Sequence, residues 1–116
     1  MYQFFNRYVY SSQLETTSAR TVFPCFDEPA IKAVFSISIT VPHGYSAISN
    51  TQYKLRKSLP NGDILYHFDR TPPMSSYLLA FVISDLKYLE GQTIDNVIVS
   101  SVISGFKILI LKVLYE

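Results

Sequence analysis

The clearest pattern in the sequence is a strict alternation of apolar and polar residues between positions 35 and 41. Serine or threonine separates the apolar residues, which are Phe35, Ile37, Ile39 and Val41. Because successive side chains of a strand point to opposite faces, this alternation predicts an antiparallel strand with one buried face. Pro42 and Gly44 are expected to end it.

A hairpin is predicted next, from strands at residues 51–57 and 64–69 on either side of Pro60, Asn61 and Gly62. The Asn-Gly pair favours the positive φ angles of a tight hairpin turn. Residues 77–83 are almost wholly apolar, which indicates a central strand covered on both faces.

The C-terminal third contains shorter apolar segments. Residues 87–89 and 93–99 are predicted as two strands separated by a turn at residues 90–92. The run 106–115 is too short and, with Lys107 and Lys112, too charged to span a bilayer, so we expect a strand or a short buried segment. Many short strands joined by Gly and Pro turns, without a convincing amphipathic helix, predict an all-β fold, an antiparallel β-sandwich.

Composition limits the classes of function. The 116 residues are 48% hydrophobic and 16% charged, enough apolar material for one packed domain. A formal net charge of +1 provides no general attraction for nucleic acid or an anionic membrane, so no nucleic-acid partner is expected. Residues 1–9 lack the continuous apolar stretch of a signal peptide, and the compartment stays open.

The residues needed for metal-dependent hydrolysis are not found. Such chemistry uses two histidines one helical turn apart with a nearby carboxylate, as in H-E-x-x-H, whereas His43 and His67 are the only histidines. They are expected to be surface or sheet-packing residues. We therefore predict no catalytic residue, no metal ligand and no cofactor in this chain.

Two further groups are interpreted as structural. Cys25, between Phe23-Pro24 and Phe26, is expected to be a small buried hydrophobe rather than a nucleophile. The cations Lys54, Arg56 and Lys57 are expected to form a solvated hairpin face.

Two pairs of polar residues are candidates for chemistry. Asp27 and Glu28 are neighbours, and we expect them to accept backbone hydrogen bonds in a turn. Gln13 and Glu15 stand at i and i+2, which in a strand places both side chains on one face, where they could hold an ammonium group together. From spacing alone, we interpret them as exposed polar residues of a strand that have no ligand.

Three segments resemble the aminopeptidase N group of zinc aminopeptidases. The segment Ser12-Gln13-Leu14-Glu15 through Phe35 resembles the signature T-Q-F-E-x-x-x-A-R-x-x-F-P-C-F-D-E-P-x-x-K-A-x-F. Ala47-Ile48-Ser49-Asn50 resembles the family's strand end, and residues 71–81 resemble its T-P-x-M-S-x-Y-L-x-A-F segment. The resemblance extends from about residue 7 to residue 91.

The resemblance implies a role for Gln13 and Glu15. In that family this region belongs to a saddle-shaped N-terminal β-sandwich next to a thermolysin-like catalytic domain with zinc. The glutamine and glutamate of its Q-x-E element help bind the free amine of a peptide N-terminus. The implied partners are a peptide N-terminus and that catalytic domain, while Asp27, Glu28 and Cys25 keep structural roles.

The sequence also departs from the family. It contains neither G-x-M-E-N nor H-E-x-x-H, so residues 1–99 are interpreted as part of the N-terminal β-sandwich and residues 100–116 as a divergent tail. We expect a fragment of a zinc metalloaminopeptidase, inactive alone, that supplies the amine-binding subsite. The alternative is a stand-alone, non-catalytic β-sandwich interaction module, which could self-associate through exposed sheet edges.

Overall fold

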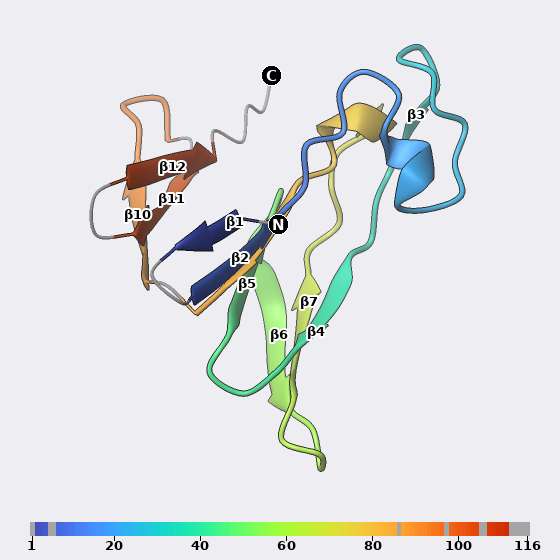
Figure 1. Ribbon diagram of the computed structural model, residues 1–116. Helices are drawn as coiled ribbons and strands as arrows, with labels where there is room; N and C mark the ends of the chain where they lie inside the picture. Colours follow the sequence, from blue (N-terminus) through green and yellow to red (C-terminus); the bar gives the residue numbers. More distant parts are fainter. Residues whose placement is uncertain (1, 5–6, 86, 97, 105–106, 112–116) are drawn as a thin grey trace.

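The computed structural model describes residues 2–4, 7–85, 87–96, 98–104 and 107–111, and confirms the all-β, antiparallel, sandwich-like fold. Every strand pair is antiparallel. Within these ranges the helical segments are two single 3-10 turns, η1 (Ala19–Thr21) and η2 (Ser76–Leu78) (Figure 1). Neither has the length that crossing a membrane would require.

The strands form four antiparallel groups. The largest sheet has the order β1 (Tyr2–Phe4), β2 (Arg7–Ser11), β9 (Phe81–Ser84), β5 (Ser46–Ser49). A three-stranded sheet has the order β4 (Ser38–Val41), β7 (Ile64–Phe68), β6 (Tyr53–Ser58). A short pair consists of β3 (Lys32–Ala33) and β8 (Met74–Ser75). The last sheet has the order β10 (Lys87–Gln92), β11 (Ile98–Ser104), β12 (Lys107–Leu111).

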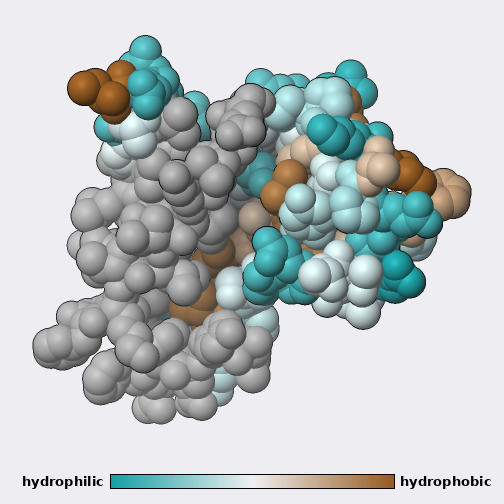
Figure 2. All heavy atoms as spheres, turned by 90° about the horizontal axis from the view of Figure 1, so that it is seen from above, coloured by the Kyte–Doolittle hydropathy of each residue, from teal (hydrophilic) through white to brown (hydrophobic). Residues whose placement is uncertain are grey.

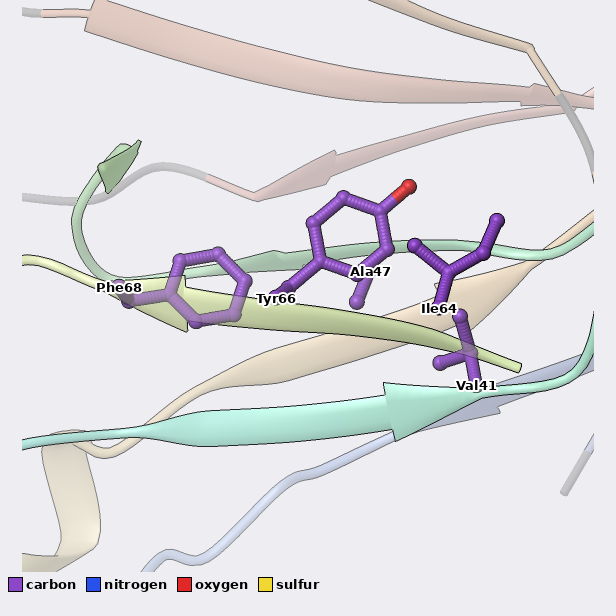
Figure 3. Packing of buried hydrophobic residues seen from close by; sticks show 5 residues of the cluster. All are labelled: Val41, Ala47, Ile64, Tyr66 and Phe68. Carbon is purple, nitrogen blue, oxygen red and sulfur yellow. The ribbon is translucent and has the colours of Figure 1, made fainter. Parts of the chain in front are cut away.

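The hydrophobic core lies between the β1-β2-β9-β5 sheet and the β4-β7-β6 sheet. It is centred on residues of β4, β5 and β7, namely Val41, Ala47, Ile64, Tyr66 and Phe68 (Figure 3). The Tyr66 and Phe68 rings stack with their centroids 6.4 Å apart. Because β5 belongs to one sheet and β4 and β7 to the other, burial of these side chains holds the sandwich together.

The alternating burial and the hairpin are confirmed, but β4 begins only at Ser38, so residues 35–37 of the predicted strand are not part of it. Ile37 and Ile39 pack against the core and Val41 is buried, whereas Ser36, Ser38 and Thr40 are exposed. Strands β6 and β7 form the hairpin, but of its Asn-Gly pair only Gly62 has a positive φ, +91°. Asn61 instead accepts a hydrogen bond from the Asp63 backbone N–H through Oδ1, and Gly62 N donates to Leu59 O at 3.0 Å, so the turn is tight but has one positive φ instead of two.

The prediction of a strand over residues 77–83 was wrong for its first half. Residues 76–78 form η2, and β9 begins only at Phe81, although it does lie centrally between β2 and β5. The backbone at 78–80 is bonded to side chains instead of a neighbouring strand. Asn50 donates to Leu78 O at 2.9 Å and accepts from Ala80 N at 2.8 Å, while Ser49 Oγ donates to Ala80 O at 2.7 Å.

Of the C-terminal strands, β10 is longer than predicted, whereas the strand predicted at 93–99 was misplaced, because β11 begins only at Ile98. The segment expected to turn at 90–92 is part of β10, and the turn falls at residues 94–95, next to Asn96 with its φ of +60°. β11 begins at Ile98 and runs past position 99, and β12 confirms a strand within the apolar run. The division into residues 1–99 and a divergent tail stays a prediction.

A buried carboxylate joins the loop after η1 to η2. Asp27 is only 5% exposed, and its Oδ1 accepts from Ser76 Oγ at 2.8 Å. Its Oδ2 accepts from the Arg20 backbone N–H at 3.2 Å and from Arg20 Nε at 3.4 Å. Burial raises the pKa of the Asp27 carboxyl, but the hydrogen bonds from Ser76 and Arg20 and the Arg20 charge outweigh burial and hold the pKa below its ordinary value of 3.8.

The first prediction concerns Asn50, which is 9% exposed. Asn50→Ala leaves Leu78 O and Ala80 N without their side-chain partner, so we expect the free energy of unfolding to fall by about 1–3 kcal/mol. Denaturant titration of the chain measures this, with exposed Gln52→Ala as the control, expected to change stability by less than about 0.5 kcal/mol. Equal stability of the two variants would contradict the proposed role of Asn50.

The second prediction is an acid dependence of stability caused by Asp27. Since its folded pKa is lowered, its stabilising contribution is present above about pH 3.8 and is lost as the pH falls through the folded pKa. Asp27→Asn should therefore lower the melting temperature by several degrees near neutral pH and flatten the acid side of the stability curve. Thermal unfolding measured from about pH 6 to about pH 2 tests this, and parallel curves for both proteins would contradict it.

Candidate functional site

Gln13 and Glu15 lie in a loop, not in the strand that the i, i+2 spacing suggested. β2 ends at Ser11, and residues 15–18 form a turn. The alternation nevertheless persists, because Gln13 and Glu15 are exposed while Leu14 between them is 4% exposed. The expectation that neither candidate is buried is confirmed.

The loop is fixed to the central strand β9 from its first residue. Ser12 N donates to Phe81 O at 3.1 Å, and Phe81 N donates to Ser12 Oγ at 2.9 Å. Beyond the buried Leu14, the loop closes through a hydrogen bond from Ser18 N to Leu14 O at 3.1 Å. An exposed pair of polar side chains is thereby held on a packed base, which limits the entropy lost when a ligand binds.

A hydrogen bond also links the two candidate residues. Glu15 N donates to Gln13 Oε1 at 2.8 Å, which orients the side-chain amide. An amide oxygen has two lone pairs, so Oε1 can accept a second hydrogen bond, and a carboxylate is an acceptor at both oxygens. An ammonium group, with three donors, matches such a pair of acceptors.

Asp27 and Glu28 do not form a paired carboxylate site. Asp27 is buried and accepts hydrogen bonds from Arg20 and Ser76, which confirms its structural interpretation, while Glu28 is exposed. Glu28 takes part in the local turn through its backbone, because its N–H donates to Phe26 O and its carbonyl accepts from Ile31 N. The Asp27 carboxylate is buried and already bonded to Arg20 and Ser76, so the two neighbours do not present a joint site to a substrate.

Cys25 is a free thiol that is half-buried. Its neighbour Phe26 is 80% exposed, so the apolar sequence around Cys25 does not correspond to a deeply buried pocket. The predicted burial of the thiol is therefore found only in part.

The two histidines lie in different environments. His67 is paired across the sheet with Ser38, whose Oγ lies 2.7 Å from His67 Nδ1, and His43 is exposed in the turn after β4. Within the part of the chain that the structure describes, no three His, Cys, Asp or Glu side chains gather as metal ligands would. The described residues do not fit a zinc site.

The predicted solvated face of the hairpin is confirmed, since all six residues of β6 are exposed. Two of its cations have partners: Lys54 Nζ lies 3.5 Å from Asp69 Oδ1, and the Arg56 guanidinium lies 5.7 Å from the Tyr66 ring centroid.

Several exposed apolar side chains lie close together in the sequence, in and around the loop that follows η1. Those between residues 22 and 34 are Val22, Phe26, Ile31 and Val34, and Leu78 is exposed in η2. Viewed from above, hydrophobic areas of the described surface are interspersed with hydrophilic residues (Figure 2). This region combines the buried Asp27 anchor with several exposed apolar side chains.

Sequence reasoning missed the residues that support the site. Ser12, Asn50 and Ser76 bond loop backbones or Asp27, yet in the sequence they are ordinary polar residues next to apolar runs. Their only visible signal was their place inside the three segments that resemble a family pattern.

The comparisons with known proteins agree with that pattern. The peptidase M1 N-terminal domain matches residues 3–78. The chain is 47% identical over 94 residues to mouse endoplasmic reticulum aminopeptidase 1, covering 81% of this chain and 10% of the relative. It is 41% identical to rabbit aminopeptidase N over 77% of this chain, and 41% identical to a leucyl aminopeptidase of Saccharolobus solfataricus over 82%.

The chain spans about a tenth of the length of these relatives, with 10%, 9% and 12% of each covered. The matched region includes the whole β4-β7-β6 sheet and strands β2 and β5 of the four-stranded sheet. It also includes the loop of Gln13 and Glu15, the Asp27 anchor and η2. Because the domain pattern matches more than half of the residues, the chain belongs to the peptidase M1 N-terminal domain family.

Proposed function

We propose that this chain supplies the amine-binding entrance subsite of a zinc metalloaminopeptidase, with Gln13 and Glu15 as the substrate-binding residues. The observation that carries the proposal is the exposed, anchored Gln13 and Glu15 pair within a peptidase M1 N-terminal domain. Peptide hydrolysis itself, and zinc, belong to a catalytic domain of the whole enzyme. No step through the metal is assigned to the residues described above.

The proposed chemistry is recognition of a charged peptide N-terminus. A peptide α-amino group has a pKa of about 7.7–8.0 and is largely protonated at neutral pH. The Glu15 carboxylate can accept a charge-assisted hydrogen bond from the ammonium group. Gln13 Oε1, already oriented by Glu15 N, can accept a second one as a neutral acceptor. Binding the end of the peptide fixes the register of the first peptide bond against the catalytic groups.

The apolar exterior around the Asp27 anchor supports the catalytic domain as the partner of this chain. Val22, Phe26, Ile31 and Val34 are exposed, and such a concentration of large apolar side chains is typical of surfaces that pack against another domain. Arg20 and Asp27 fix the loop that presents them.

The alternative function, a non-catalytic β-sandwich interaction module, is favoured by one observation: all six residues of strand β6 are exposed. Coding sequence that continues into G-x-M-E-N and H-E-x-x-H distinguishes the two proposals in favour of the aminopeptidase.

The third prediction tests the binding pair in a version of the enzyme that contains the catalytic domain. Glu15→Ala should lower kcat/KM for aminoacyl substrates at least about tenfold, equivalent to roughly 1.4 kcal/mol, because a charge-assisted contact is lost. Gln13→Ala should have a smaller effect, because it removes a neutral acceptor. The matched control is Glu28→Ala, which removes another exposed carboxylate and should leave kcat/KM nearly unchanged. Full kcat/KM in a folded Glu15→Ala enzyme would refute the amine-binding role.

The fourth prediction makes Ser12 a positioning residue for the pair. Ser12→Ala removes the acceptor of Phe81 N–H and should reduce kcat/KM about three- to tenfold, whereas Ser12→Thr keeps the hydroxyl and should restore it. A double-mutant cycle gives the decisive measurement. Since Ser12 acts through the loop, Ser12→Ala should cost little in a Glu15→Ala background, and additive losses would contradict this role.

A further inference from the structure

Strand β4 is an uncharged edge of its sheet. In the order β4-β7-β6 it pairs only with β7 among the described strands, through four consecutive residue pairs without a register shift (Figure 1). The segment at residues 35–41, which contains β4, has no charged residue, no proline and no glycine. An open edge with high β-propensity and no charge is a template for pairing with another extended chain.

The opposite edge of the same sheet is protected against such pairing. Strand β6 carries Lys54, Arg56 and Lys57, and its pairing with β7 is irregular between Tyr53 and Leu55. Charged side chains and bulges are two of the features by which natural sheets discourage pairing at an edge. Strand β4 has neither feature, so it is the edge of this sheet that is open to a partner.

The hydrogen bonds to β7 show which backbone groups of β4 face outward. Phe68 N donates to Ile37 O at 2.9 Å, so the Ile37 and Phe68 pair is hydrogen-bonded. Hydrogen-bonded and non-hydrogen-bonded pairs alternate along an antiparallel ladder. In the register of this pairing, Ser38 and Thr40 therefore occupy non-hydrogen-bonded positions and direct their backbone N–H and C=O groups away from β7.

The side chains of β4 and of the residue before it leave apolar surface at this edge. Ile37 and Ile39 pack against the core but are only half-buried, whereas Val41 is 1% exposed. The other face of the strand carries Ser38 and Thr40, which are uncharged and exposed. A strand added here would cover the two isoleucines, and burial of apolar surface favours association.

Antiparallel pairing of β4 with β4 of a second copy is compatible with both faces of the strand. A two-fold axis at Ile39 places Ser38 opposite Thr40 of the other copy, so their outward backbone groups can bond to each other. On one face Ile39 then packs against Ile39 of the second copy. On the other face each serine lies opposite a threonine, which is a favourable cross-strand pair.

We propose that β4 is the interface of a symmetric homodimer, in which two β4-β7-β6 sheets join edge to edge into one antiparallel sheet. The free edges of the joined sheet are then the two protected β6 strands, so the assembly closes as a dimer. A segment of another protein is the competing occupant, but an edge without charges has little means of selecting one. This interface is separate from Gln13 and Glu15 and does not depend on aminopeptidase activity.

The fifth prediction tests the interface with two double variants of the 116-residue chain. Ser38→Lys with Thr40→Lys places like charges opposite each other, so sedimentation equilibrium should show dimerisation weakened about tenfold relative to the unmodified chain. Ser38→Lys with Thr40→Glu places lysine opposite glutamate, so at low salt its dimer should form within about threefold of the unmodified chain. Both variants lose the Ser38 side-chain hydrogen bond to His67, so that loss cannot explain a difference between them.

A disulfide cross-link checks the register independently. In a Cys25→Ser background, Ile39→Cys places two thiols at a non-hydrogen-bonded pair on the axis, where the Cα atoms are about 4.5 Å apart, within the range of a disulfide. Air oxidation should therefore produce a covalently linked dimer. The control is Leu55→Cys in the same background, an exposed position on β6, which should cross-link much more slowly.

Each other outcome overturns the proposal. A chain that stays monomeric at micromolar concentration removes the dimer. If that monomer binds a fluorescein-labelled peptide of alternating valine and threonine, the edge takes a segment of another protein instead. Equal dimerisation of the two folded double variants places the interface elsewhere, and so does faster cross-linking at position 55 than at position 39. Open-ended association beyond a dimer contradicts the closed assembly.

Discussion

The arrangement of the loop that follows η1 depends on one buried carboxylate. Asp27 is 5% exposed and is stable as a charged group only because Ser76 Oγ and the Arg20 backbone and side chain donate to it. Those donors come from two 3-10 segments separated by more than fifty residues in the chain, so the carboxylate fixes their relative position. Ser75 Oγ, which donates to Pro29 O at 2.6 Å, and the paired Phe35 and Thr71 extend the same connection toward the sandwich.

Side-chain hydrogen bonds are used again where the chain enters β9. Backbone groups at residues 78–80 are satisfied by Asn50 and Ser49, and Phe81 N by Ser12, so short polar side chains replace ladder bonds. Ser12, Ser49, Asn50 and Asp27 of the family pattern thus take part in hydrogen bonds that hold the fold. Gln13 and Glu15 differ because they are exposed on a loop whose neighbours Ser12 and Leu14 are anchored, and this contrast supports a binding role for them.

Sequence patterns predicted the parts of this fold that depend on burial. The period of two at Ile37, Ile39 and Val41 follows directly from one face packing on the core. Patterns failed where side-chain hydrogen bonds decide the backbone: the apolar run at 77–83 resembles one strand, yet Asn50 holds its first half in a loop. The i, i+2 spacing of Gln13 and Glu15 likewise predicted their shared exposure but not the loop, because Ser12 and Ser18 form the bonds that bend the chain there.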